Sequence, residues 1–481
     1  MATNSPDYSP LIIEKNHPHI KSVTRLEAIG FSKLPVKKPV TLKELESSVR
    51  NYAIFHLSAS LILATLSQVT AGPARAEEQA EWAQRYDADA RLTVSRSTTP
   101  ILSEQTVVAT EAAIDRFRNI VANGGWPQVS STHQLRLGTN SPAVSVLRKR
   151  LIISGDIGSE TGASPIFDSY VEAAVRRFQA RHGIIETGIV NQQTFTALNV
   201  PAETRLRQLE TNLVRLRSFS KDLGNRYVTA NIPAAQVETV ENGAVVTHHI
   251  AGVGKIDRQS PVMQTKAIQI NFNPFWTVPA SVIRKDLIPK MQADPNYLRD
   301  SHIRVYNKDG QELQPEQINW RSLDAMNYKF RQDIGGDFNS LGVVRIDIAN
   351  PYGVYMHDTP AKGVFGDDFR FVSSGCIRLQ NVRDYVAFLL RETPGWDRDH
   401  IDQVIASGER VDVKIMPAVP VYWVYVTGWG APDGVTQFRD DIYQRDGLGV
   451  IDAATMAPAS GSQTTQQTGS NGLLHNEENE N

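Results

Sequence analysis

The chain contains a single cysteine, Cys376, which lies in the run SSGCIRL. His357 precedes it by nineteen residues, in the run MHDTP. A thiol nucleophile requires a base that accepts its proton, donors that hold a developing oxyanion, and open space for the attacked carbonyl group. A histidine such as His357 is expected to accept a proton near neutral pH, Gly375 removes a side chain beside the thiol, and the backbone amides of residues 374–376 can act as donors. The spacing alone leaves two readings open: acyl transfer by a thiol, or a small core cysteine with a buried histidine, which is the commoner case for an arbitrary pair.

The composition and the remaining motifs exclude several other classes of function. With 50 Lys+Arg against 52 Asp+Glu the formal net charge is -2, so the chain has no overall basic field to attract nucleic acid. One cysteine cannot build an internal disulfide framework or a zinc site of several thiolates. His248 and His249 are neighbours that face opposite sides on a strand, which disfavours a shared metal. The run GVGK at residues 252–255 lacks the spacing of a phosphate-binding loop, so we expect catalysis without nucleotide, metal or other cofactor.

Residues 227–455 are predicted to form the sheet-rich domain that positions the thiol. Runs rich in β-branched residues alternate there with turn residues, and the pair Asn242-Gly243 is typical of a tight hairpin. The interval 281–338 is instead helical and irregular in pattern and is predicted to be an insertion. Its apolar residues are expected to form one face that closes over the groove around the thiol; they are Leu287, Ile288, Met291 and Leu298. The expected strands are 237–250, 266–272, 341–348 and 411–415, and a helix is expected after Asn381.

The part of the chain before this domain has the apolar repeat of helices. Residues 77–132 are predicted to be a helical scaffold segment, 133–200 a compact helical unit, and 201–226 a connecting helix. In the connecting helix the residues expected to face inward are Leu206, Leu209, Leu213 and Leu216. The residues expected to face solvent are Arg205, Arg207, Arg215 and Arg217. Together with the sheet-rich half, these helices predict an α+β fold.

The first 76 residues have the pattern of an export signal with an unusually long leading segment. Residues 52–66 are uncharged and mostly apolar, too few to span a bilayer comfortably at about 20 residues per helix. Ala74-Arg75-Ala76 follows, with small residues at the spacing that signal peptidase reads. We expect cleavage after Ala76, export, and no stable membrane span afterwards; an uncleaved anchor and a buried core helix are the alternatives. Residues 456–481 lack the apolar content to pack and are expected to be disordered.

The histidine and cysteine motifs together resemble the signature of a known enzyme family. HDTP followed by SSGCIRL is similar to the His and Ser-x-Gly-Cys-Ile/Val-Arg signature of the L,D-transpeptidases with a YkuD-like catalytic domain. The runs NPFWTVP, NPYGVYMHDTP and VYWVYVTGWGAPDGVTQFRDDIY resemble the larger periplasmic members, which carry a capping subdomain where residues 281–338 lie. Many members have His where this chain has Ser374. The unit 133–200 resembles the three-helix peptidoglycan-binding domain through Phe178-Gln179, His182-Gly183 and Thr194.

The resemblance implies a fold, a reaction and a set of site residues. The fold would be a mostly β catalytic domain with an inserted helical cap, plus a small three-helix peptidoglycan-binding domain. Cys376 would attack the carbonyl of the third residue of a donor tetrapeptide stem, release D-Ala and form a thioester, which an amine of a second stem resolves into a 3-to-3 crosslink. His357 would act as base and then acid, oriented by the carbonyl of Asp358. The other implied site residues are Ser374 and Gly375 at the oxyanion, and Trp276, Tyr355, Ser373 and Arg378 in the substrate groove.

The nucleophile motif does not identify the acyl acceptor. Water as acceptor would make the protein an L,D-carboxypeptidase or a crosslink hydrolase with the same cysteine, and a wall-binding scaffold with an idle catalytic domain is a third alternative. The expected partners are peptidoglycan stem peptides and glycan in the periplasm, with an outer-membrane lipoprotein as a further candidate acceptor. Because a thioester must wait for an amine while water competes, the insertion 281–338 is expected to act as a lid. Basic residues of the unit 133–200 are expected to favour the anionic wall, namely Arg136, Arg148, Lys149, Arg150, Arg176, Arg177 and Arg181.

Overall fold

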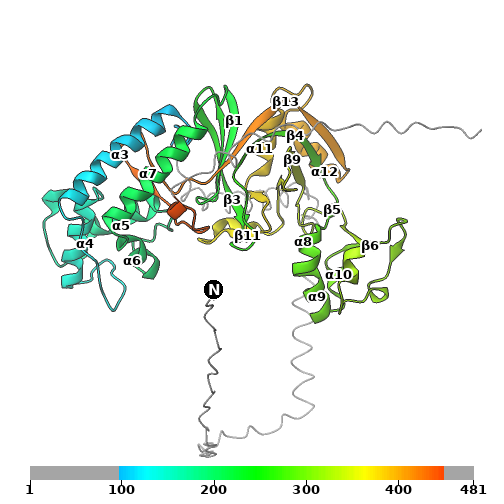
Figure 1. Ribbon diagram of the computed structural model, residues 1–481, viewed down its shortest axis with the longest axis horizontal. Helices are drawn as coiled ribbons and strands as arrows, with labels where there is room; N and C mark the ends of the chain where they lie inside the picture. The colour runs from blue at the N-terminus through cyan, green and yellow to red at the C-terminus, as the bar shows by residue number, and fades with distance from the viewer. Residues whose placement is uncertain (1–96, 449–481) are drawn as a thin grey trace, which may run out of the picture. The chain divides into compact units, whose positions relative to one another are not determined.

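The computed structural model describes residues 97–448 (Figure 1). The predicted export signal within residues 1–76 and the predicted disordered tail at 456–481 lie outside the described residues. Between residues 97 and 448, no helix is long and apolar enough to cross a membrane. This part of the chain has a helical half that ends at Phe219 and a sheet-rich half that carries the thiol.

Two long helices, α3 (Glu104–Ala122) and α7 (Ala202–Phe219), pack side by side in the helical half (Figure 1). α3 begins after Ser103, whose side chain accepts a hydrogen bond from the Thr106 amide and so satisfies one of the donors exposed in the first turn. Between them in sequence lie shorter helices that share a separate apolar core around Leu147 and Phe178. These are α4 (Pro142–Ile153), α5 (Ser169–Arg181) and α6 (Gln192–Leu198), with a 3-10 turn at Ser159–Thr161.

The residues that resemble a peptidoglycan-binding domain hold this small helical unit together. The Gln179 side-chain amide donates to the Ile189 carbonyl at 2.9 Å and to the Thr194 hydroxyl at 3.1 Å, and its oxygen accepts from the Gly188 amide at 2.8 Å. The His182 ring stacks on Phe178 with 3.9 Å between ring centroids. The motif is therefore explained by packing and hydrogen bonding within the unit.

The sheet-rich half is built on a nine-stranded sheet of order β11-β3-β12-β10-β9-β4-β13-β1-β2, which closes on itself through an added pairing of β2 with β3. The hairpin turn between β2 and β3 is the predicted Asn242-Gly243 pair, in which both residues have positive φ, 50° and 76°. The strands are β1 (Arg226–Asn231), β2 (Gln236–Glu241), β3 (Ala244–Gly254), β4 (Met263–Phe272), β9 (Val344–Ile348), β10 (Met356–His357), β11 (Phe371–Ser373), β12 (Ile377–Leu379) and β13 (Val411–Val424).

The predicted helix after Asn381 is α11 (Val382–Leu390), and it packs against β3 and β13. Its apolar side chains recur every three or four residues, so Tyr385 and Leu389 are both buried in the core of the sheet domain. Burial of each such side chain is worth roughly 1.5–3 kcal/mol. α12 (Arg398–Ser407) packs on α11, and a small sheet of β14 (Gly428–Gly430) and β15 (Thr436–Phe438) contacts the helical half through α3, α5 and α7.

The insertion between β5 (Trp276–Thr277) and β8 (Lys329–Gln332) is a cap with its own apolar core. Only its first half is helical; its second half supplies β6 and β7 to a four-stranded sheet of order β5-β8-β6-β7, so the helical cap that we expected is half sheet. The reason is a period-two pattern, because Ile303 and Val305 are buried in β6 while Arg304 is exposed. The remaining elements are α8 (Ala280–Val282), a π-helical turn (Ile283–Leu287), α9 (Ile288–Ala293), α10 (Tyr297–Asp300), β6 (Ile303–Tyr306), β7 (Glu312–Leu313), and 3-10 turns at Pro315–Gln317 and Asp324–Asn327.

The apolar face that was expected to close over the groove is buried within the cap. Leu287, Ile288, Met291 and Leu298 all pack with Phe330 in the cap core. Of the four, Leu287 also lines the cleft. The expectation was wrong for Ile288, Met291 and Leu298, because they face the rest of the cap core, and the periodicity of a helix does not show what covers it.

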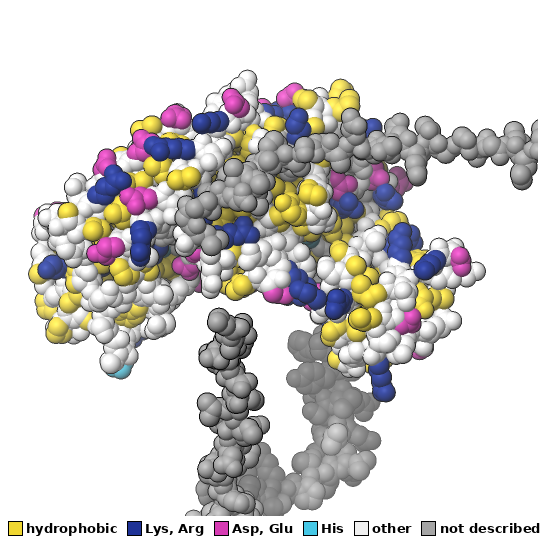
Figure 2. All heavy atoms as spheres, in the orientation of Figure 1, with side chains coloured by type: hydrophobic (Ala, Val, Ile, Leu, Met, Phe, Trp, Pro, Cys, Tyr) yellow, Lys and Arg dark blue, Asp and Glu magenta, His cyan; other side chains and the backbone are white. Residues whose placement is uncertain are grey.

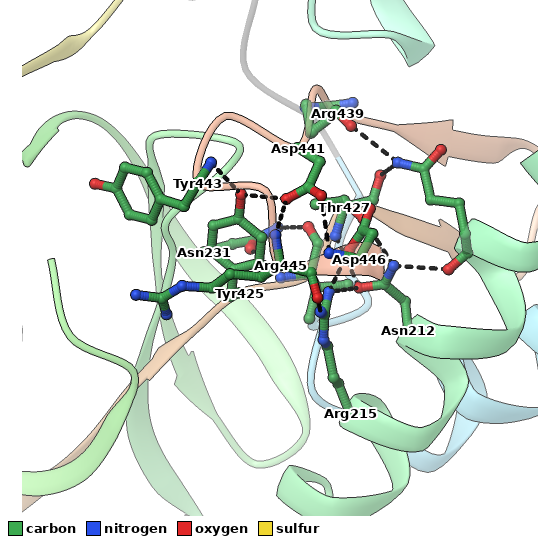
Figure 3. A network of polar contacts seen from close by, with 12 residues as sticks. Asn212, Arg215, Asn231, Tyr425, Thr427, Arg439, Asp441, Tyr443, Arg445 and Asp446 are labelled. Atoms are coloured by element: carbon green, nitrogen blue, oxygen red, sulfur yellow. Dashed lines mark hydrogen bonds and ion pairs between the residues drawn. The ribbon is translucent and has the colours of Figure 1, made fainter. Parts of the chain in front are cut away.

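Two arginines of α7 that were expected to face solvent are buried. Arg205 lies over the ring of Phe438, with its guanidinium carbon 4.6 Å from the ring centroid. Arg215 forms an ion pair with Asp446 at 2.6 Å, within a polar network that joins α7 to the C-terminal segment (Figure 3). Both corrections have one cause, since this face of α7 packs against the segment after β13 and not against water.

Three of the basic residues expected to favour the wall are also buried. Arg148 pairs with Asp168, Arg150 lies 3.7 Å above the Trp126 ring centroid, and Arg181 makes two 2.6 Å hydrogen bonds to the carboxylate of Asp156. Each of these guanidinium groups is therefore engaged within the helical unit, because a buried guanidinium requires an acceptor or an aromatic face. The remaining basic residues of that set, Arg136, Lys149, Arg176 and Arg177, are exposed.

Candidate active site

His357 and the cysteine loop meet because their strands are neighbours. β10 and β12 run parallel, with Met356 opposite Ile377 and His357 opposite Arg378. The Ile377 amide donates to the carbonyl of Tyr355 at 3.1 Å. Both His357 and Cys376 line a cleft of about 670 Å³, whose other wall is formed by the cap. The pairing of these strands thus brings together two motifs that are separate in sequence.

The His357 imidazole is buried and oriented by a backbone carbonyl. Its Nδ1 lies 2.5 Å from the oxygen of Asp358. A carbonyl can only accept a hydrogen bond, so Nδ1 carries the proton and Nε2 is left as the basic nitrogen. Burial lowers the pKa of His357 to about 3, and the nearby charge of Arg378 acts in the same direction. The ring is therefore a neutral base in the resting protein.

The Asp358 carboxylate points away from the imidazole. It accepts a hydrogen bond from the Val343 amide at 3.1 Å and pairs with Lys362. Gly342 has φ of 58°, and a Cβ there would lie 2.2 Å from the carboxylate oxygen, so this close approach requires glycine. As the family resemblance implies, the orienting group is the backbone carbonyl of Asp358 and not its side chain.

The Cys376 thiol is protonated at rest. Burial raises its pKa to about 11, and this outweighs the hydrogen bonds from Tyr355 and the positive charges of Arg345 and Arg378. Near pH 7 the imidazole is neutral and the thiol is protonated, so neither side chain carries a charge. The thiolate must then form as the proton moves to His357 during attack on a bound carbonyl group.

The cysteine loop is held by two serine hydroxyls. Ser373 donates to the Cys376 carbonyl at 2.6 Å and accepts from the Gly375 amide at 3.1 Å. Ser260 donates to the Gly375 carbonyl at 2.8 Å. Gly375 has φ of 113°, a conformation that favours glycine. Ser373 and the Gly375 amide, which the sequence placed at the substrate, are thus engaged in fixing the loop, while the Ser374 side chain is exposed at the cleft.

Trp276 and Tyr355, the two aromatic residues predicted for the groove, contact each other across the base of the cap. The Trp276 indole donates to the Tyr355 hydroxyl at 3.2 Å, and both residues line the cleft. Burial raises the pKa of Tyr355, so its hydroxyl stays protonated at neutral pH. The fourth groove residue, Arg378, also lines the cleft, and its buried Nε has no hydrogen-bond partner among the described residues. No carboxylate among the described residues acts on the charge of Arg378, so an anion bound in the cleft can supply its counter-charge.

Three charged residues near the thiol were missed from sequence. Arg345 in β9 lies 4.8 Å from the Tyr355 ring centroid and pairs with Asp347 at 2.6 Å. Its alternation with apolar residues in the run VRIDI is a signal that one face of this strand is charged. Arg258 and Asp286 also line the cleft and pair with each other, but no motif marks either.

The loop 255–260, which contacts the cysteine loop through Ser260, is itself fixed by a buried tyrosine. The Tyr443 hydroxyl donates to the Gly254 carbonyl at 2.5 Å and accepts from the Ser260 amide at 3.3 Å. The Tyr443 amide in turn donates to the hydroxyl of Tyr425, which belongs to the same network as Asp441 and Arg215 (Figure 3). Buried and mutually bonded groups of this kind fix a single conformation.

The two adjacent histidines have different partners. His249 contacts the Thr247 hydroxyl at 2.7 Å and the Gln380 carbonyl at 3.0 Å, while His248 contacts the Ser97 carbonyl. Within residues 97–448, no group of three or more His, Cys, Asp or Glu side chains is arranged to hold a metal ion.

Comparison with known proteins gives the class of these domains. Residues 225–409 match the family model of the L,D-transpeptidase catalytic domain (YkuD), and residues 140–198 match that of a "Putative peptidoglycan binding domain". A curated relative, "Putative L,D-transpeptidase" of Haemophilus influenzae, is 32% identical over 241 residues, which is 50% of this chain and 48% of the relative. The chain thus spans about half the length of the curated relative that it matches.

Solved structures of L,D-transpeptidases are also similar to this chain. That of Mycobacterium smegmatis is 16% identical and covers 42% of this chain and 58% of its own, with a TM-score of 0.21. That of Stackebrandtia nassauensis is 14% identical and covers 55% of this chain and 90% of its own, with a TM-score of 0.23. By the family models, this chain contains an L,D-transpeptidase catalytic domain preceded by a peptidoglycan-binding domain. The resemblance of the sequence motifs and the α+β fold are confirmed.

Proposed function

We propose that the protein is a peptidoglycan L,D-transpeptidase that forms 3-to-3 crosslinks through a cysteine thioester. One observation carries the proposal: the lone thiol and a neutral imidazole, oriented by a backbone carbonyl, line one cleft beneath a cap. The alternative reading of Cys376 and His357 as inert core residues does not fit their position in this cleft. Arg378, with its unpartnered Nε, is suited to hold a carboxylate of the donor stem.

In the first half-reaction, the Cys376 sulfur attacks the carbonyl carbon of the third stem residue while its proton passes to Nε2 of His357. The backbone amides of Ser374 and Cys376 hold the negative charge on the carbonyl oxygen, since the Gly375 amide already donates to Ser373. The C–N bond to D-Ala then breaks, and the imidazolium returns the proton to the leaving amine. The products are free D-Ala and a thioester on Cys376.

In the second half-reaction, the amine of another stem attacks the thioester carbon and loses a proton to His357. The C–S bond breaks, the sulfur takes the proton back from His357, and an amide crosslink is released. Water in place of the amine would give a tripeptide, which is the carboxypeptidase outcome; the same route on a crosslink would give a hydrolase. Because the cap forms one wall of the cleft, we propose that it excludes water as a lid until the amine arrives.

We further propose that the enzyme acts in the periplasm on peptidoglycan stems and glycan. The apolar run 52–66 and the small residues that follow it support export. The match of residues 140–198 to a peptidoglycan-binding family supports the wall as its site of action. An outer-membrane lipoprotein is a further candidate acceptor, because its amine would resolve the same thioester.

The test is mass spectrometry of products from tetrapeptide muropeptides and of the protein after exposure to a carbapenem. We expect crosslinked dimer, free D-Ala, and one covalent carbapenem per wild-type chain. Cys376→Ala and His357→Gln should each remove turnover, while His133→Gln, at an exposed histidine of the helical half, serves as the matched control. Tripeptide monomer alone would identify a carboxypeptidase. Full turnover by Cys376→Ala would exclude the thioester mechanism.

A further inference from the structure

Arg258, in the loop between β3 and β4, connects the cap to the residue beside the nucleophile. Its guanidinium forms a bidentate ion pair with Asp286 of the cap. Nη2 lies 2.9 Å from Oδ1, and Nη1 makes a second, shorter contact with Oδ2. Nη1 also donates to the Ser374 hydroxyl at 2.9 Å. The exposed fractions of the two charged side chains are 13% for Arg258 and 28% for Asp286. This ion pair is therefore partly shielded from water, yet it borders the cleft.

Asp286 is surrounded by positive charge. Lys255 and Lys290 line the same cleft, and Figure 2 shows basic side chains gathered where the cap meets the sheet domain. The hydrogen bonds of Arg258 hold the pKa of Asp286 below its ordinary value against partial burial, and the charges of Lys255 and Lys290 act in the same direction. Arg258 also contacts Asp257 through its Nε at 3.4 Å, but Asp257 does not line the cleft. The cleft thus contains a cationic cradle of Arg258, Lys255 and Lys290, and the carboxylate that it holds within the cleft is that of Asp286.

The geometry of this cradle is that of a carboxylate receptor. A guanidinium fork pairs with two carboxylate oxygens at once, which gives orientation as well as attraction. The substrate of the proposed reaction is a stem peptide with several free carboxylates, and it must enter the cleft that Asp286 borders. A ligand carboxylate can occupy this position on the Arg258 guanidinium only if the Asp286 carboxylate leaves it. Asp286 lies in the π-helical turn of the cap, and its side chain is partly exposed, so it can turn toward water.

We propose that a carboxylate of the donor stem binds Arg258 at the position that the Asp286 carboxylate occupies in this structure. On binding, that carboxylate pairs with Arg258, assisted by Lys255 and Lys290, and displaces the side chain of Asp286. The inference rests on the proposed function. It makes Arg258 a specificity-determining residue, since the exchange favours donors whose carboxylate reaches the fork. Because Arg258 also contacts Ser374, the exchange takes place next to the nucleophile.

The experiment compares tetrapeptide donors in which each free carboxylate is amidated in turn. In wild type, amidation of one particular carboxylate should raise KM about tenfold, the loss expected of a charge-assisted hydrogen bond, with kcat changed less than about twofold. Arg258→Gln should raise KM for the unmodified donor by a similar factor and should be insensitive to that amidation. Asp286→Asn should lower KM several-fold, because the internal competitor has lost its charge.

Lys285→Gln is the matched control. Lys285 pairs with Asp257 at 3.4 Å, which also joins the cap to the loop 255–260, but neither residue lines the cleft. This variant should keep the wild-type KM for every donor. Melting curves of each variant separate loss of fold from loss of binding.

Two results would overturn the inference. One is a wild-type enzyme for which no single amidation raises KM, a comparison that needs no variant to fold. The other is an equal amidation effect in wild type and in Arg258→Gln. A wild-type protein that neither reacts with a carbapenem nor consumes the donor would instead refute the proposed function, so the two failures are distinguishable.

Discussion

The catalytic domain carries two attachments, the helical half and the cap, and they are joined to it in different ways. On the helical side the contacts are buried. The Arg439 guanidinium donates to the Arg181 carbonyl at 3.1 Å, the Gln208 amide donates to the Thr427 carbonyl at 3.1 Å, and the Gly430 amide donates to the Thr110 hydroxyl at 3.0 Å. Breaking any of these would leave a buried polar group without a partner, which costs about 1–3 kcal/mol.

On the cap side the polar contacts border water. The Lys285–Asp257 pair has exposed fractions of 48% and 61%, and the Arg258–Asp286 pair borders the open cleft. Exposed ion pairs contribute about 0–1 kcal/mol, because water replaces each partner at little cost. The difference indicates that the helical half is held by buried contacts, whereas the ion pairs between the cap and the loop 255–260 are ones that a charged ligand can replace.

The largest effect is expected from breaking the buried pair of the helical unit. Asp156→Ala leaves the Arg181 guanidinium buried without its carboxylate; the two side chains have exposed fractions of only 3% and 9%. We expect a loss of about 3–5 kcal/mol in the free energy of unfolding, measured by urea denaturation. A loss below about 1 kcal/mol would show that the helical unit does not depend on this pair.

Replacing the cap should change the ratio of the products, while the thiol should still form a covalent adduct. With residues 285–333 exchanged for a short Gly/Ser linker, Cys376 should still react with a carbapenem, because the thiol, the imidazole and the Asp358 carbonyl lie outside that segment. The ratio of tripeptide to crosslinked dimer should rise several-fold, as water reaches the thioester. A folded deletion variant with the wild-type ratio would contradict the lid.

The dependence of the acylation rate on pH tests whether Cys376 and His357 are both uncharged before the reaction. Burial holds the pKa of His357 at about 3, so the base stays unprotonated well below the ordinary histidine value, and burial raises the pKa of Cys376 to about 11, so little thiolate forms at neutral pH. The rate of carbapenem acylation should vary less than about twofold between about pH 5.5 and 8.5. A rise with pH through an apparent pKa near 6.5 would point to an imidazole that is protonated at rest.

The sequence placed Cys376 and His357 together in one candidate site but did not predict the ionic contacts around them. Cys376 and His357 belong to short local motifs, and the strands that bring them together are adjacent in the sheet. Arg258 and Asp286 lie on a loop and on an insertion, and nothing in either segment indicates the other as its partner. Such a pair depends on where the cap rests, which local patterns do not encode.

The burial of arginines in the helical half was missed for a related reason. An arginine on an amphipathic helix is usually solvated, so Arg215 was assigned to the outer face of α7. Its carboxylate partner, Asp446, is 231 residues away in the chain. The half-sheet cap was missed because its strands are short and follow a helical stretch. Long elements and local turns, such as the Asn242-Gly243 hairpin and α11, were predictable because their patterns lie within a few residues.

The smallest effect is expected from Lys285→Gln, which tests the cap side of the comparison directly. The 3.4 Å separation of Lys285 and Asp257 and their exposure place this pair among those worth less than about 1 kcal/mol. At an ionic strength of about 0.15 M the Debye length is about 8 Å, so added salt should reduce even that contribution. Urea denaturation should show a change below about 1 kcal/mol, and hydrogen exchange in α8 and α9 should become slightly faster. If the variant instead loses more than about 2 kcal/mol, this ion pair holds the cap as firmly as the buried contacts hold the helical half, and the contrast between the two attachments is wrong.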